Sequence, residues 1–390
     1  MGKSKKKAIK FNKQFTMPLM LVIVFVGASI LTSGSLVRPQ NISNLVLQNA
    51  YVIVMACGML LCILTGGNVD LSVGSTLCLS AACVSQLLLG GVSVPVAILI
   101  SIGVGIAIGA IQGYLVGFTR VPPFICTLAG MFVIRGVARV VLDSKTVNIT
   151  NEDFFNVFGS YIQIPGLDND GFYLSALLFG IILSVAICLF MVGSRISKKK
   201  RGSDISRLPV FLTKIIITLV VIIAYSAMLA QYKGIPVMLL WILGVAVLFM
   251  FVCSQTVFGR HFYAVGGNAL AAKLSGIDSR KVLFWAYLIM STLAAFSGLL
   301  VATRIGSVDG NMGNAYEMDA IAACFIGGAS AYGGSGTIQG VVVGALFLGV
   351  INQAMSILGL PDQWQYVVKG AVLLAAVIFD VVSSKKAAKA

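Results

Sequence analysis

Charged side chains are rare within the apolar stretches of this sequence, and those that occur are candidates for function. Arg135 and Arg139 lie four residues apart in one stretch, so they would share one face of a helix. Lys369 lies near the beginning of the last stretch, and Asp70 follows a glycine pair at the edge of an earlier one. Ionisable groups inside a membrane commonly mark functional sites. For Arg135 two interpretations stay open: a charge that packs helices or meets the interface, and a residue of a transport pathway.

The residue patterns of most enzymes are missing. His261 is the only histidine, which argues against a histidine-rich metal site and a Ser-His-Asp triad. No G-x-x-x-x-G-K-[ST] segment occurs, so the chain does not hydrolyse ATP through that phosphate loop. None of the eight cysteines has a CxxC spacing, and all lie in apolar stretches. We therefore expect no catalytic residues, no metal site and no cofactor of its own.

Two glycine-rich segments interrupt the apolar pattern, one in each half of the chain. Residues 65–75 read TGGNVDLSVGS, and residues 326–337 read IGGASAYGGSGT. Each has a Gly-Gly pair and then a later glycine followed by serine. Broken hydrophobic segments in corresponding positions of two halves indicate a binding or gating region. The alternative is close packing of membrane helices through small residues.

The composition places most of the protein surface in lipid. Of the 390 residues, 58% are hydrophobic and 11% are charged, and the mean hydropathy is +0.98. A soluble domain carries about 25% charged residues. This chain has too little polar material to coat a fold in water, which excludes a soluble enzyme, a nucleic-acid-binding protein and a disordered scaffold.

The elements that position these residues must be membrane helices, because a bilayer core needs about 20 apolar residues per helix. The fold class expected is all-α, a polytopic membrane protein with about 10–12 transmembrane segments, cytoplasmic termini and glycine-broken half-helices in each half. The segments 71–90 and 317–331 are the short ones. The expected segments are 17–37, 45–65, 71–90, 94–118, 122–142, 172–194, 210–230, 236–257, 283–303, 317–331, 337–358 and 364–382.

Loop charges support this topology. With the N-terminus inside, most of the 28 lysines and arginines fall on the inner side, where positive charge is retained, and most acids fall outside. We expect a basic cytoplasmic N-terminus (1–16), one transmembrane domain (17–382) and a basic cytoplasmic tail (383–390). A further basic cluster lies in the loop 195–209.

The loop 258–282 is too polar to span and too regular for a linker. Asn268 can cap a short helix over residues 269–274, and Gly276 can end it. A short helix on the inner face could transmit force from a soluble motor to the neighbouring spans. The alternative is an amphipathic helix resting on lipid.

Three segments carry a resemblance to a known family. Leu270-Ala271-Ala272 followed by Gly276 resembles the EAA-x-x-x-G loop of bacterial ABC importer permeases, with leucine in place of glutamate. GGNVDLSVGS at 66–75 is similar to the GGIDLSVGS signature of the monosaccharide permeases, and residues 316–340 also match that family. The extra pair of spans over about 172–230 resembles the longer xylose or multiple-monosaccharide permeases.

The resemblance implies a transport subunit of the inner membrane without enzymatic activity. It implies a homodimer, a separate ATPase that binds ATP and Mg, and an extracytoplasmic sugar-binding protein. The cargo implied is a pentose or hexose such as xylose, ribose, arabinose or galactose. The implied ATPase-coupling residues are Gly259, Arg260, Asn268, Ala271, Ala272, Lys273 and Gly276.

Translocation or gating is expected of the broken segments. The residues that match the family signatures are Gly66, Gly67, Asp70, Ser72, Gly74, Gly327, Gly328, Gly333 and Gly334. Arg135 and Asn352 are added from their position in spans, and Gln353 and Thr127 are further polar groups that a sugar could pass. Two alternatives remain: an ABC permease for a nucleoside, a branched-chain amino acid or a signalling furanose, and an ion-coupled transporter. The missing midplane acid and the coupling-loop pattern count against the latter.

Overall fold

The computed structural model describes residues 13–169, 171–200, 202 and 208–388. The basic N-terminal cluster up to Lys10, and also Arg201, Arg207 and Lys389, lie outside the described residues. Within the described part, eight helices are long and apolar enough to cross a membrane. The expected all-α, polytopic fold is confirmed, and the strands are pairs of two-residue segments.

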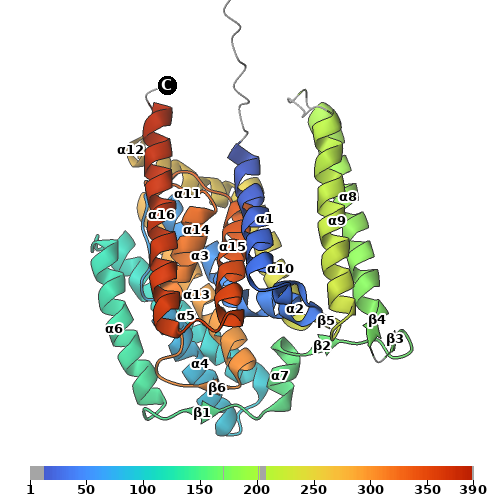
Figure 1. Cartoon of the computed structure of the whole chain (residues 1–390). Helices are drawn as coiled ribbons and strands as arrows, with labels where there is room; N and C mark the ends of the chain where they lie inside the picture. Colours follow the sequence, from blue (N-terminus) through green and yellow to red (C-terminus); the bar gives the residue numbers. More distant parts are fainter. Residues whose placement is uncertain (1–12, 170, 201, 203–207, 389–390) are drawn as a thin grey trace, which may run out of the picture.

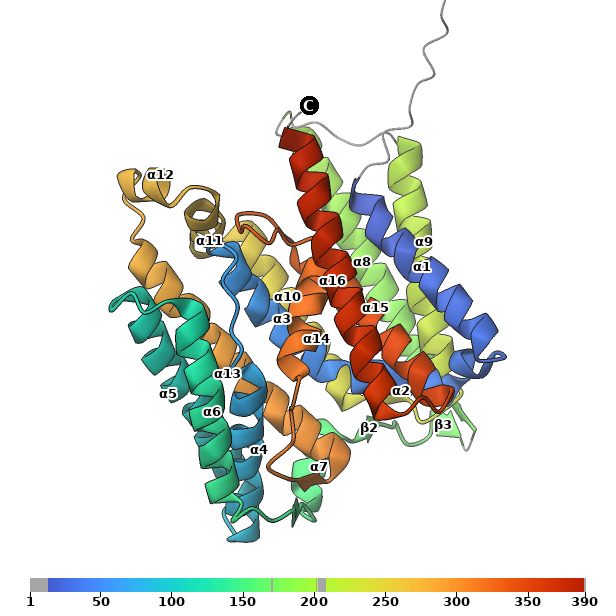
Figure 2. The ribbon, with the colours of Figure 1, turned by 60° about the vertical axis from the view of Figure 1, so that its left-hand side comes forward.

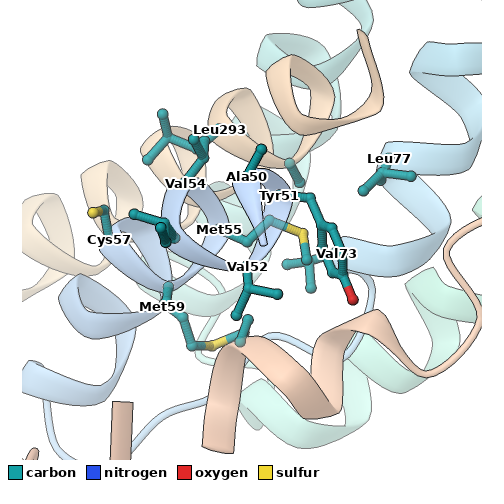
Figure 3. Close-up of a cluster of buried hydrophobic side chains, with 14 of the residues drawn as sticks. Ala50, Tyr51, Val52, Val54, Met55, Cys57, Met59, Val73, Leu77 and Leu293 are labelled. Carbon is teal, nitrogen blue, oxygen red and sulfur yellow. The ribbon is translucent and has the colours of Figure 1, made fainter. Parts of the chain in front are cut away.

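The core of the protein is built around α3 (Ala50–Leu64), every residue of which is buried. The preceding α2 (Pro39–Gln48) continues into it as one apolar segment. Figure 3 shows α3 side chains such as Met55 beside Val73 and Leu77 of α4 and Leu293 of α13. The helices packed around α3 are α10 (Val237–Gln255), α13 (Ser279–Ile305), α14 (Tyr316–Ile326) and α15 (Ile338–Ile357).

A second layer consists of α4 (Val73–Leu89), α5 (Val94–Gly117) and α6 (Pro123–Val141). The contact between α5 and α13 depends on glycine. A Cβ atom at these glycines would lie between 2.3 and 2.7 Å from an α13 atom, so the two helices meet almost backbone to backbone. The glycines recur every four residues along α5: Gly105, Gly109, Gly113 and Gly117.

The remaining long helices lie at the edge of the bundle. α1 (Lys13–Leu31) packs on α15, and α16 (Asp362–Ala388) packs on α14. The hairpin of α8 (Leu174–Lys200) and α9 (Leu208–Ala230) stands beside the bundle in Figures 1 and 2. The first predicted segment, 17–37, was too long: α1 ends at Leu31, because Ser33 and Gly34 adopt left-handed backbone angles.

One end of the molecule carries the short elements that link the helices. They are η1 (Ser35–Val37), α7 (Glu152–Phe158), β1 (Val147–Asn148) paired with β6 (Ser307–Val308), β2 (Tyr161–Ile162) paired with β5 (Ile235–Pro236), and β3 (Asp168–Asn169) paired with β4 (Phe172–Tyr173). The opposite end carries the start of α1, the end of α16, α11 (Val257–Gly267) and α12 (Ala269–Leu274) (Figure 1). The basic residues at the end of α8 and around α11–α12 therefore share one end, as the loop charges predict.

Both segments expected to be half-helices are short: α4 has 17 residues and α14 has 11. The loop 258–282 holds more helix than expected. In addition to α12, it contains α11, which begins directly after α10 and turns away from it at Thr256.

Candidate functional site

The α11–α12 segment is a folded platform at one end of the molecule. The Thr256 hydroxyl caps α11 by accepting from the Gly259 backbone N–H at 2.9 Å. The Asn268 side chain caps α12 by accepting from the Ala271 N–H at 2.9 Å. Gly276 ends α12 with a left-handed φ of 83°, which a residue without Cβ adopts at low cost. The capping roles predicted for Asn268 and Gly276 are confirmed.

Asp278 then starts α13 and keeps the platform close to that helix. Its carboxylate accepts from the Arg280 backbone N–H at 3.0 Å and from the Arg280 guanidinium. The Arg280 side chain hydrogen-bonded to Asp278 holds the pKa of that carboxyl below its usual value. The cap is therefore charged at neutral pH.

α12 presents two leucines away from the protein. Ala272 is buried against the protein, whereas Leu270 is 69% and Leu274 is 82% exposed. Residues four positions apart lie on one helix face, so the two leucines form a single apolar surface. Large exposed apolar groups on a short polar-flanked helix indicate contact with another molecule.

The platform touches the end of α3 and the second broken segment through glycine. A Cβ atom on Gly266 of α11 would lie 1.7 Å from the Leu64 carbonyl oxygen and 2.7 Å from the Gly334 nitrogen. Real Cβ atoms do not come so close, so no side chain fits there. The Gly334 N–H donates to the same Leu64 oxygen at 3.0 Å. The end of α3, the second broken segment and α11 thus meet at one point, which we call the glycine junction (Leu64–Gly67, Gly266–Gly267 and Gly333–Gly336).

Three further contacts complete the glycine junction. A Cβ on Gly67 would lie 2.1 Å from the Ala331 carbonyl oxygen, and one on Gly333 would lie 2.6 Å from the Gly66 Cα. Tyr263 of α11 donates its hydroxyl to the Gly336 carbonyl oxygen at 3.0 Å. A displacement of α11 would therefore press directly on the backbone at the end of α3 and on that of the second broken segment, which in turn contacts Gly66 and Gly67.

The rest of the first broken segment is held by a buried polar chain. Asp70 accepts from the Ser72 backbone N–H at 2.8 Å and from the Ser72 hydroxyl at 2.6 Å. Gln112 of α5 donates to that hydroxyl at 2.8 Å. Asp70 is fully buried, and its Oδ2 has no hydrogen-bond partner among the described residues. The candidate residues Asp70 and Ser72 therefore fix the start of α4 against α5.

Gly74 makes a contact that the sequence did not suggest. A Cβ on it would lie 2.3 Å from the Gly313 carbonyl oxygen and 2.5 Å from Glu317 Oε2. The chain between α13 and α14 (residues 306–315) is a third interruption, and it brings the first turn of α14 beside the first turn of α4. Two short helices thus begin next to each other inside the bundle, an arrangement found at the centre of transporters.

The other predicted glycines have separate roles. Gly327 packs against α15, since a Cβ there would lie 2.5 Å from Gly340 backbone atoms, whereas Gly328 has open space and a φ of 86°. The Asn352 Oδ1 and the buried Gln353 Oε1 of α15 have no hydrogen-bond partner among the described residues. Thr127 donates its hydroxyl to the Pro123 carbonyl oxygen of its own helix, at 3.0 Å.

The Arg135 side chain binds the loop 306–315, which is the third interruption. Its guanidinium donates to the carbonyl oxygens of Gly310 and Met312. One turn later, Arg139 donates to the Asn311 side chain at 3.1 Å. Of the two interpretations of Arg135, these contacts favour the packing role, at a loop that leads into α14.

Sequence reasoning missed a buried acid in α14. Asp319 is 1% exposed, and its Oδ2 accepts from the Tyr51 hydroxyl of α3 at 2.7 Å and from Lys369 Nζ of α16 at 3.0 Å. Tyr51 also stacks on Tyr316, with ring centroids 4.0 Å apart. The sequence YEMD at 316–319 contained the signal, but only the folded chain brings Lys369 to it.

Comparison with known proteins gives the family. The model described as "Branched-chain amino acid transport system / permease component" matches residues 41–196 and 156–377. This chain belongs to that permease family. The match covers both broken segments and the α11–α12 platform.

Several relatives within the family are similar along almost the whole chain. The xylose transport system permease protein of Haemophilus influenzae is 34% identical over 95% of this chain and 97% of its own length. The corresponding xylose protein of Escherichia coli is 32% identical over 95% and 92%. The ribose import permease protein of Escherichia coli is 31% identical over 93% and 92%. None of the solved structures matches the chain.

Proposed function

We propose that this permease is the transmembrane subunit of an ATP-binding-cassette importer that carries a pentose or hexose across the bacterial inner membrane. It would act as a homodimer with a separate ATPase, which binds ATP and Mg, and with an extracytoplasmic sugar-binding protein. The observation that carries the proposal is the glycine junction, where the α11–α12 platform lies directly on two interruptions of the membrane helices.

The coupling mechanism follows from that contact. An ATPase that closes on α12 pushes α11, and α11 transmits the displacement to the end of α3 and to residues 333–336. The half-helices α4 and α14, which begin beside each other at Gly74 and Gly313, then move apart or together. Alternating access between the two sides of the membrane needs such elements with two arrangements.

Leu270 takes the place of the glutamate in the family loop, and its surroundings favour an apolar contact with the ATPase in place of a polar one. Leu270 and Leu274 form an exposed apolar surface on α12. We expect the partner ATPase to receive them in an apolar groove, as amphipathic helices are commonly bound.

The cargo is inferred from the relatives. Several similar relatives are named for xylose or ribose, which favours a monosaccharide. The family description names branched-chain amino acids, so leucine belongs in the test as a competing cargo. An ion-coupled mechanism is less supported, because the chain belongs to a family described as a permease component of a transport system.

The test is uptake by vesicles holding the permease, the ATPase and the sugar-binding protein. Labelled xylose or ribose should enter only when ATP is present, and leucine should not enter. Replacing Leu270 and Leu274 with serine should abolish uptake and release the ATPase during purification. The control Leu167→Ser, which alters a 39% exposed leucine at the other end of the molecule, should do neither. Uptake without any ATPase would overturn the proposal.

A second variant tests the platform without altering its surface. Replacing Gly276 with valine places a β-branched residue at a φ of 83°, where nothing else lies within 4 Å. Such a change strains the backbone and displaces the end of α12. We expect uptake to be lost while the homodimer still assembles, as measured by size-exclusion chromatography with light scattering. Unchanged uptake would contradict the coupling role of this turn.

A further inference from the structure

The hairpin α8–α9 has no part in the mechanism above, and its surroundings suggest a different role. Only 17% of the apolar window of α8 and 6% of that of α9 are buried in the protein. Large side chains such as Phe190 (77% exposed) and Leu189 (68% exposed) point away from the chain. These flanks therefore face lipid acyl chains.

The tip of the hairpin is strongly basic. Residues 195–214 contain seven lysines and arginines and one aspartate. The helix α8 has 27 residues, which at 1.5 Å per residue is about 40 Å. A hydrocarbon core is about 30 Å thick, so the end of α8 reaches the headgroup region. Lys199 and Lys200 are exposed there.

Two contacts shape the tip. The Arg195 guanidinium lies over the Phe211 ring, 4.4 Å from its centroid, and thereby joins the two helices. One of its nitrogens, Nη1, is enclosed and has no hydrogen-bond partner among the described residues. The half-buried guanidinium carries further N–H donors, which can bind a phosphate oxygen.

The tip lies away from the coupling platform. In Figures 1 and 2 the hairpin stands on one side of the bundle, while α12 lies on the other. This separation argues against a shared docking surface for the ATPase, and the lipid-facing flanks below the tip argue for a ligand that brings its own acyl chains.

We propose that the tip of the α8–α9 hairpin is a binding site for anionic phospholipid. Phosphate and glycerol groups would be held by Arg195, Lys199 and Lys200, and the acyl chains would lie along the exposed flanks. Clusters of basic residues at the membrane surface attract anionic headgroups in this way. The proposal does not depend on the cargo or on the ATPase.

The experiment measures binding of phosphatidylglycerol to the purified full-length permease in neutral detergent by native mass spectrometry. The variant replaces Lys198, Lys199 and Lys200 with glutamine. A matched control replaces Lys385, Lys386 and Lys389 of the C-terminal tail, which removes the same charge elsewhere. The wild type should bind phosphatidylglycerol but not phosphatidylcholine, and binding should weaken with salt.

We expect the hairpin variant to lose roughly tenfold or more in affinity and the tail variant to stay close to wild type. Equal affinity of wild type and hairpin variant, or equal binding of both lipids, would overturn the proposal. Loss of ATPase co-purification at unchanged lipid affinity would also overturn it, because the tip would then be a protein contact. Since uptake is not measured, failure of the proposed transport function would leave this result unaffected.

Discussion

Two apolar regions of this protein have opposite surroundings. In the segment Pro39–Leu64, which contains α3, 89% of the apolar window is buried inside the protein. In α9 (Leu208–Ala230), the share is 6%. Both would be read from the sequence as membrane spans, yet one is enclosed by other helices and the other is exposed on the surface of the protein.

The difference teaches what apolar residues do in a membrane. Lipid tails are as apolar as leucine, so hydrophobicity does not draw one membrane helix to another. Helices come together where small residues allow backbone contact, as at the glycine junction and along α5. In the described part of the hairpin, Gly180 lies close to the Ser226 side chain, and this contact joins α8 to α9.

The largest effect is expected from a substitution at the glycine junction, where backbones are in contact. In the variant Gly266→Ala, the new Cβ would lie 1.7 Å from the Leu64 carbonyl oxygen, and overpacking against backbone costs about 1–3 kcal/mol or more. We expect uptake to fall below about a tenth of wild type. The control is Gly267→Ala, because nothing lies within 4 Å of that position. If both variants transported equally, the junction would not transmit motion.

The buried pair Asp319–Lys369 should give the next largest effect. Removing one partner, in Asp319→Leu or Lys369→Met, leaves a charge uncompensated and should destabilise the fold by about 3–5 kcal/mol. The double variant removes both charges and should recover most of that loss. Thermal unfolding in detergent measures this. A double variant as unstable as the sum of the two singles would refute the pairing.

The same substitution, leucine to alanine, can be made in α3 and in the hairpin to compare how strongly each region depends on packing. Leu60→Ala empties a site in α3 that is 0% exposed and should cost about 2–5 kcal/mol of stability. Leu189→Ala, on the lipid-facing side of α8, should stay within about 0.5 kcal/mol. Denaturation midpoints of the two variants in one detergent provide the measurement. Comparable losses would mean that the hairpin is covered by protein.

The smallest contrast concerns the two arginines of α6. Arg135→Gln removes charged hydrogen bonds to the Gly310 and Met312 carbonyls, which are commonly worth about 1.5–3 kcal/mol. Arg139 is exposed and contacts one side chain, so Arg139→Gln should have less effect. We expect uptake to fall several-fold in the first variant and to change little in the second. The reverse order would mean that Arg139, rather than Arg135, holds the loop.

Much of the fold could be predicted from local sequence patterns. The length of apolar runs predicted the helices, and glycine spacing predicted the shortened α4 and α14. Capping signals at Asn268 and Gly276 located α12 to the residue. These features depend on neighbours in the chain, which is why a sequence contains them. The helix α11 was missed because the polar residues Arg260 and His261 and the glycine pair Gly266-Gly267 resemble a loop.

The candidate site was accessible only in part. The two broken segments were identified, but not that Gly266 joins them or that residues 306–315 interrupt the chain a third time. Asp319 was not recognised as an intramembrane acid, since its partners Tyr51 and Lys369 are 268 and 50 positions away.

The sequence alone determined that this protein lives in a membrane, that it is helical, which end gathers positive charge and which family its signatures match. These properties come from composition and from short runs of neighbouring residues. Tertiary structure alone decided which apolar helices meet protein and which meet lipid. It also decided that three glycine segments meet at one point and that the buried acid Asp319 pairs with Lys369. Such contacts depend on backbones approaching within about 4 Å across long stretches of chain, and no local pattern encodes that distance.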